Sequence, residues 1–272
     1  ICPTGALTEA LREQLRQHKA ALMAMLDPTT DLARQPHAKH GRNPLSFAQR
    51  RLWFLQQLEG GNLYNVGGSF ALHGKVDLDA LQGALNAIIT RHSVLRTVYG
   101  QENGEPYQVL RTNGVLQLDR FVLEGDELSR KQEWQQISQE YADRNFHLEQ
   151  DLMLRVGVVD YGQDEYRLMI HMHHIASDGW SLSIFMRELN HYYTAISQGD
   201  TIDSMALPVP PMQYADYARQ QDAAFRRGAM AAGCDFWRAY LQDMPDVHSL
   251  PLDAPRPKEQ TYRGGVVTSQ LP

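Results

Sequence analysis

The feature that most constrains the fold is an alternating stretch of residues that leads almost directly into a helical one. In residues 166–174, YRLMIHMHH, one face carries Tyr166, Leu168, Ile170, Met172 and His174. The other face carries Arg167, Met169, His171 and His173. This period of two predicts a strand, and residues 154–174 together predict a hairpin that turns at residues 162–164. Residues 181–197 predict a helix, because their apolar side chains recur at helical spacing.

The remaining patterns mix helices and strands along the chain. We predict further helices at residues 45–59, 77–92, 127–144 and 214–242, with Ser46 and Asp77 as N-caps of the first two. We predict strands at residues 65–74, 95–100 and 107–111. Because strands and helices alternate without an internal repeat, the predicted class is α/β or α+β.

The composition excludes several classes of protein. The formal net charge of the 272 residues is −6 and no basic stripe stands out, which argues against a nucleic-acid partner. No apolar run approaches the roughly 18 residues of a membrane span. Only two cysteines are present, which argues against a disulfide framework and favours a cytoplasmic protein. The chain begins with Ile1, and we interpret it as a segment of a longer polypeptide.

The first 43 residues differ from the rest. Residues 7–26 predict one amphipathic helix, with Thr8 as N-cap and Asp27-Pro28 as its stop. Residues 28–43 carry Pro, Gly, Thr and charge without a period, which indicates a linker. We therefore divide the chain into residues 1–27, a linker at 28–43, and a domain at 44–272.

Two adjacent histidines at the end of the alternating strand are the main candidates for chemistry. His174 continues the more apolar row, so its ring is either a core residue or faces a cavity. Desolvation would keep such a ring neutral and able to accept a proton near pH 7. His173 points to the opposite face of the strand, so the pair is poorly placed to chelate one metal ion. A purely structural pair remains an alternative.

Asp178 and Gly179 follow in the connection to the next helix. The Asp178 carboxylate can close this loop by pairing with an arginine or with backbone N–H groups. Gly179 would permit a backbone conformation that is closed to other residues.

Four motifs in order resemble those of the condensation domains of nonribosomal peptide synthetases. Residues 173–179, HHIASDG, match the HHxxxDG motif of that family. Residues 45–58 resemble its SxAQxRLWxL motif, and residues 214–221 resemble its YxDYAxWQ segment with Gln220 in place of Trp. Residues 91–97, RHSVLRT, resemble its RHExLRT motif with Ser93 in place of Glu.

This resemblance implies a chloramphenicol acetyltransferase-like lobe and a role for each site residue. His174 would act as general base or position the attacking amine, and Gly179 would offer an N–H to the developing oxyanion. His173 and Asp178 would be structural, with Asp178 in an ion pair with Arg96 or Arg91. Trp180 and Ser181 would support the site more weakly.

The resemblance also implies partners. No cofactor would bind directly, because two carrier proteins would deliver the substrates on 4′-phosphopantetheine arms. Residues 1–27 are similar to the C-terminal half of TubC-type docking domains, which implies that an upstream part of the synthase is a further partner. Two other functions remain open: a stand-alone CoA-dependent acyltransferase of the same superfamily, and a binding module without chemistry.

Overall fold

The computed structural model describes residues 41–201, 204, 206–245, 251 and 255 of the chain. The predicted N-terminal helix and residues 28–40 of the predicted linker lie outside the described residues. In the described part, no helix is long and apolar enough to cross a membrane.

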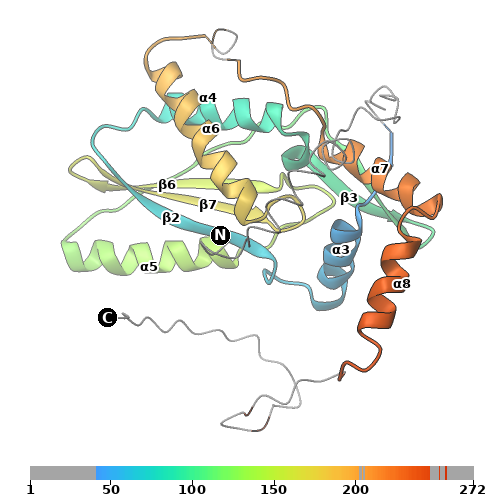
Figure 1. Ribbon diagram of the computed structural model, residues 1–272. Coiled ribbons are helices and arrows are strands. Elements are labelled where there is room, and N and C mark those ends of the chain that lie inside the picture. The colour runs from blue at the N-terminus through green and yellow to red at the C-terminus, as the bar shows by residue number, and fades with distance from the viewer. Residues whose placement is uncertain (1–40, 202–203, 205, 246–250, 252–254, 256–272) are drawn as a thin grey trace, which may run out of the picture. The chain divides into compact units, whose positions relative to one another are not determined.

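Helices and strands alternate along the described part of the chain, as the sequence patterns predict (Figure 1). The helices are α3 (Phe47–Glu59), α4 (Leu78–Arg91), the 3₁₀ helix η1 (Ser93–Arg96), α5 (Glu127–Asp143), α6 (Gly179–Ser197), α7 (Tyr214–Arg226) and α8 (Ala231–Tyr240). The strands are β1 (Asn43–Pro44), β2 (Asn65–His73), β3 (Thr97–Glu102), β4 (Glu105–Leu110), β5 (Asp119–Val122), β6 (Leu154–Gly162) and β7 (Glu165–His173).

The larger sheet has four strands in the order β2-β7-β6-β5. β7 pairs antiparallel with both β2 and β6, whereas β5 pairs parallel with β6. Gly162, Gln163 and Asp164 all have positive φ, which is the backbone conformation that a tight hairpin needs. The predicted hairpin and its turn are therefore confirmed.

Helices cover both faces of this sheet. α4 and α6 lie on one face and α5 lies on the other (Figure 1). Leu168, Ile170 and Met172 of β7 belong to the core under α4 and α6, while Met169 belongs to the core under α5. The alternation of residues along β7 thus corresponds to two apolar layers, one on each face.

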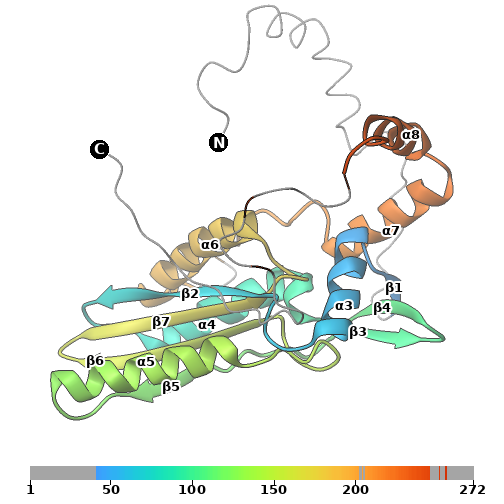
Figure 2. The same ribbon diagram turned by 90° about the horizontal axis from the view of Figure 1, so that it is seen from below.

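A smaller sheet, β1-β4-β3, lies next to α3 and α7 (Figure 2). α3 begins with a reciprocal capping box between Ser46 and Gln49, which confirms the predicted N-cap. A third core packs Trp53 of α3 against Tyr99 of β3 and Ile175, which follows the histidine pair. The histidine loop is therefore packed against α3 as well as against the larger sheet.

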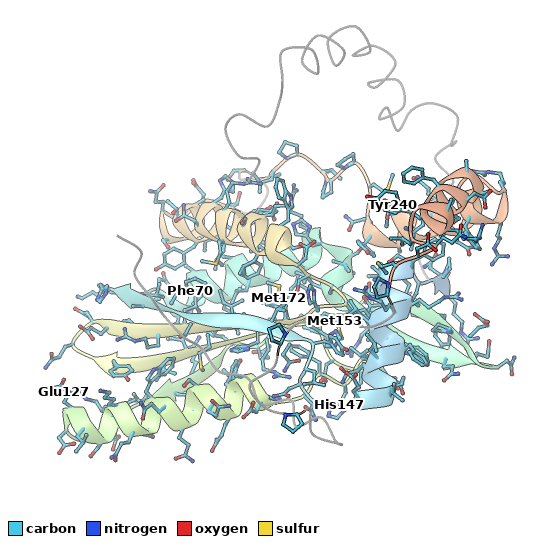
Figure 3. The ribbon with its side chains drawn as sticks, turned by 60° about the horizontal axis from the view of Figure 1, so that its bottom comes forward. Phe70, Glu127, His147, Met153, Met172 and Tyr240 are labelled. Atoms are coloured by element: carbon cyan, nitrogen blue, oxygen red, sulfur yellow. The ribbon has the colours of Figure 1, made fainter. Side chains whose placement is uncertain are left out.

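The single helix predicted at residues 214–242 is wrong. The chain forms α7 and α8 with a break between them, where Gly228 has a φ of 77°. A left-handed residue ends a helix, and glycine adopts this conformation without steric cost. α8 has no buried residue, and its exposed side chains include Phe236, Trp237 and Tyr240. Tyr240 is labelled in Figure 3.

Candidate functional site

The histidine pair ends β7 and begins a short loop that leads into α6. The backbone N–H of His174 donates to the carbonyl of Tyr64 (2.8 Å), just before β2. The Ala176 N–H and the Ser177 hydroxyl both donate to the His173 carbonyl, at 3.0 and 3.2 Å. These bonds close the loop back onto the end of β7 and turn residue 174 out of the strand.

The His174 ring is exposed and has a defined tautomer. Its Nδ1 lies 2.7 Å from the Ser177 carbonyl oxygen, which only accepts hydrogen bonds, so Nδ1 carries the proton. In the neutral ring, Nε2 therefore holds the free lone pair. A nitrogen in this state is able to accept a proton from a bound molecule.

His174 lines a pocket of about 410 Å³ at the junction of β2, β7 and α6. Met172 lies in its wall and is labelled in Figure 3. The full lining consists of Asn65, Val66, Gly67, Ile170, Met172, His174, Ser177, Asp178, Gly179 and Leu182. Ile170 and Met172 line this pocket together with His174. Of the two alternatives that the sequence left for this ring, a core residue or one that faces a cavity, the exposed ring beside the pocket favours the second.

His173 is buried and faces the other side of the sheet. Its side chain is 1% exposed and packs near the rings of Tyr64 and Phe146. Burial lowers the pKa of His173 to about 4, so the ring is neutral at pH 7. The Ile175 N–H donates to His173 Nδ1 at 3.1 Å. His173 thus holds the loop from inside the core and does not line the pocket.

Asp178 caps α6, and the predicted ion pair with Arg96 or Arg91 is wrong. Its Oδ1 accepts from the backbone N–H and the hydroxyl of Ser181, at 2.8 and 2.6 Å. These hydrogen bonds, first from the side chain and then from the backbone of Ser181, lower the pKa of Asp178. The negative charge of Asp178 therefore lies at the N-terminus of α6, where the helix dipole stabilises an anion.

The two arginines have other partners. Arg96 donates to the carbonyls of residues 89, 90 and 111. Arg91 forms a buried salt bridge with Glu188 of α6 (3.1 Å), and His92 Nε2 lies 2.6 Å from the same carboxylate. The sequence analysis missed Glu188, although its position three residues after Phe185 places a carboxylate on the apolar face of that helix.

Gly179 and Trp180 begin α6. Gly179 is absent from the glycines with positive φ, so the prediction of a special backbone conformation there is wrong. Its N–H is one of the first in the helix, and it has no acceptor among the described residues. Gly179 lines the same pocket as His174. Trp180 is 80% exposed, so it is not a core aromatic.

Comparisons with known proteins identify the family of the chain. The family model of the condensation domain matches residues 39–272. The chain is 33% identical over 269 residues to malpinin synthetase of Mortierella alpina, with 97% of this chain and 3% of that protein covered. It is 34% identical over 247 residues to phosphinothricin tripeptide synthetase PhsC of Streptomyces viridochromogenes, with 90% of this chain and 22% of that protein covered. The chain thus spans only a small part of the length of these relatives.

Two solved structures extend the likeness to the fold. The complex of the X-domain and OxyB from teicoplanin biosynthesis matches with a TM-score of 0.69 and 25% identity, covering 79% of this chain and 47% of that one. A structure described as condensation domain-mediated chain release from the enacyloxin polyketide synthase matches with a TM-score of 0.61 and 26% identity, covering 89% and 47%. The chain spans about half the length of these solved chains, and it belongs to the condensation domain family.

Proposed function

We propose that this chain carries the catalytic histidine of an amide-forming reaction between two carrier-bound substrates of a nonribosomal peptide synthetase. The observation that carries the proposal is the state of His174. Its Nδ1–H is held by the Ser177 carbonyl, and its Nε2 lone pair is available beside a pocket of about 410 Å³. Membership of the condensation domain family supports the same reaction.

In the proposed step, the amine of an acceptor aminoacyl thioester attacks the carbonyl carbon of a donor acyl thioester. His174 Nε2 accepts the proton that the amine loses as the C–N bond forms, and the same proton goes to the sulfur when the C–S bond breaks. General base catalysis of this kind is worth typically about 10²–10⁴-fold. Holding both tethered substrates in one pocket contributes further, because the entropy of bringing them together is lost on binding.

The start of α6 supports the oxyanion role of Gly179. As the amine attacks, negative charge develops on the thioester oxygen, and a fixed N–H donor stabilises that charge. Asp178 accepts from Ser181 at the same helix end, and Gly179 lines the pocket, so we propose its N–H as the donor to the oxyanion. His173 and Asp178 would support the site by holding the loop and the helix in place.

The proposed partners are a donor and an acceptor carrier protein, each with a 4′-phosphopantetheine arm. No directly bound cofactor is needed for the step above. We also propose that residues 1–27 recruit an upstream synthase protein; these residues lie outside the described part of the chain, and the proposal rests on sequence resemblance alone.

The test is turnover of the full-length protein that contains this chain, with loaded donor and acceptor carriers and mass spectrometry of the products. His174→Asn retains a side-chain donor for the Ser177 carbonyl but has no base. We expect it to lower kcat by about 10²–10⁴-fold. The matched control is His73→Ala, an exposed histidine at the far end of β2, which should keep full turnover.

Two outcomes would contradict the proposal. Full turnover by His174→Asn would remove His174 from the mechanism. Transfer from a soluble acyl-CoA donor at the same rate as from a loaded carrier would favour the stand-alone acyltransferase instead.

A further inference from the structure

Ile175, the residue after His174, has a partner for its side chain, its backbone N–H and its carbonyl. Its side chain is 3% exposed and packs with Trp53 and Tyr99. Its N–H donates to His173 Nδ1 at 3.1 Å, and its carbonyl accepts from Gln49 Nε2 at 3.4 Å. The peptide units before and after Ile175 therefore each have a fixed partner.

The bond from the Ile175 N–H also favours one tautomer of His173. Because Nδ1 accepts that bond, the proton of the neutral ring is on Nε2. His173 Nε2 lies 3.4 Å from Gln56 Oε1, which accepts it. One acceptor on α3 thus selects the form of His173 that is able to hold the loop.

Gln49 and Gln56 are seven residues apart on α3, which is about two helical turns, so both lie on the same face. Gln49 is 1% exposed and belongs to a buried network: its Nε2 also donates to the Tyr99 hydroxyl, and its Oε1 accepts from Gln108 and from the Ser46 N–H. Because this network also caps α3, Gln49 is bound rigidly to the body of the domain.

We propose that Gln49 and Gln56 are positioning residues that set the direction of the His174 ring, Gln49 through the Ile175 carbonyl and Gln56 through the tautomer of His173. The inference rests on the proposed function, in which His174 Nε2 accepts the proton of the amine. Neither glutamine touches the pocket. They act on the peptide next to His174 and leave substrate binding unchanged.

The consequence of losing the Gln56 acceptor follows from the geometry. Without it, the Nε2–H of His173 faces no acceptor, and the other tautomer places an N–H against the Ile175 N–H. The loop then loses the bond that fixes residue 175. A catalytic group displaced by about 1 Å is able to cost on the order of 10²-fold in rate.

Gln56 is the better residue to test, since loss of Gln49 would also break the cap of α3 and lower stability. Gln56→Met removes the acceptor with little change in length, whereas Gln56→Glu retains an acceptor oxygen. Both variants lose the bond from Gln56 Nε2 to the Gly61 carbonyl (2.9 Å), so that bond cannot explain a difference between them. Gln57→Met, at an exposed position of the same helix, is the matched control.

Two measurements test the proposal. In the full-length protein, kcat and KM are measured with loaded carriers. In the 272-residue chain, histidine-selective ¹⁵N labelling reports the tautomer of His173, whose signals are identified by their loss in His173→Asn. We expect Gln56→Met to lower kcat by between about 10-fold and 10²-fold with KM unchanged, and to lose the Nε2–H tautomer. Gln56→Glu and Gln57→Met should keep both properties.

The proposal is overturned if Gln56→Met retains wild-type kcat, if His173 keeps its tautomer in that variant, or if Gln56→Glu fails to restore both. It is also overturned if Gln57→Met loses as much activity as Gln56→Met. These results are distinct from failure of the proposed function, which is decided by the turnover of His174→Asn.

Discussion

Replacement of Asp178 separates two explanations for an acidic residue at this place in the motif. In the structure, Asp178 is the N-cap of α6 and its carboxylate accepts two hydrogen bonds from Ser181. The alternative from the sequence is an ion pair with Arg96 or Arg91. Asp178→Ala removes both interactions. Asp178→Asn removes the charge but retains an oxygen that caps a helix as well as aspartate does.

The two explanations predict different losses of unfolding free energy for these two variants. Loss of an N-cap side chain costs about 0.5–2 kcal/mol, typically about 1 kcal/mol. The charge at the helix start adds about 0.3–1 kcal/mol, and the exposure of Asp178 places it at the low end of that range. We therefore expect Asp178→Ala to lower the free energy of unfolding by about 1 kcal/mol, and Asp178→Asn to lower it by roughly 0.3 kcal/mol.

Thermal unfolding of the chain is a suitable assay. For a domain of this size, about 1 kcal/mol corresponds to a shift of about 2–4 °C in Tm. Asp126 caps α5 with the same geometry, its Oδ1 accepting from the Ser129 N–H at 2.8 Å. Asp126→Ala is therefore a matched loss of a cap far from the pocket, and it should lower the Tm without changing turnover.

The effect should also depend on pH. The pKa of Asp178 is lower in the folded chain than its ordinary value of about 3.9, because Ser181 donates to its ionised form. This contribution to stability is therefore present above the ordinary value and is lost as the pH falls through the lower, folded value. The cap explanation is refuted if Asp178→Asn destabilises as much as Asp178→Ala, or if Arg96→Ala is non-additive with Asp178→Ala.

Two further predictions concern the strands beside the site. Gly67→Ala would place a Cβ 2.2 Å from the Ile170 carbonyl oxygen, so we expect a loss of about 1–3 kcal/mol or more in unfolding free energy. Gly68→Ala meets nothing within 4 Å and is the control; equal Tm values for the two variants would contradict the close approach of β2 to β7. The pKa of His173 is lowered to about 4, against about 6.5 in an unfolded chain. The unfolded state binds the proton first as the pH falls, so between these values the wild type should lose about 3 kcal/mol of stability. Urea unfolding would show this loss, and an equal loss in His173→Asn would assign it to other groups.

The sequence predicted the helices and strands around the site because each of them depends on residues that are close together in the chain. The period of two along residues 166–174 corresponds to the two apolar layers on the faces of β7. Ser46 and Asp77 act as N-caps where the sequence places them, because a cap bonds only to residues two or three positions away. The turn of the β6–β7 hairpin is set by a few residues in the same way.

The helix break near Gly228 has only an ambiguous local signal, because Arg226 and Arg227 followed by a glycine are typical of a helix end. Residues on both sides of it favour helix, and a glycine inside such a stretch is tolerated at a cost of about 1 kcal/mol. Only the backbone of the folded chain, with Gly228 at a φ of 77°, separates α7 from α8. The sequence pattern therefore correctly predicted helix on both sides of Gly228 but missed the break between α7 and α8.

The partners of charged groups were the least predictable part of the site. Asp178 and Arg96 both belong to motifs of the family, yet each bonds to backbone or hydroxyl groups close to it in sequence or in space. A sequence identifies which residues carry charge. Whether a carboxylate then binds an arginine or a nearby backbone N–H depends on how the chain packs. The Ser181 N–H is only three residues from Asp178, which gives the cap the advantage of a short loop.

The contacts of Glu188 explain how the other end of the histidine loop is held. Glu188 binds Arg91 and His92 at the end of α4, so it fixes α6 against the helix next to it. α6 begins with Gly179, and its cap follows the loop that carries His174. Thus α3 holds the start of the loop through two glutamines, and α4 holds its end through a buried carboxylate. A site whose reactive nitrogen lies on a short loop gains its precision from such supports on rigid elements. The polar residues that sequence reasoning overlooked are therefore those that do not line the pocket but contact the loop that carries His174 or the helix that follows it.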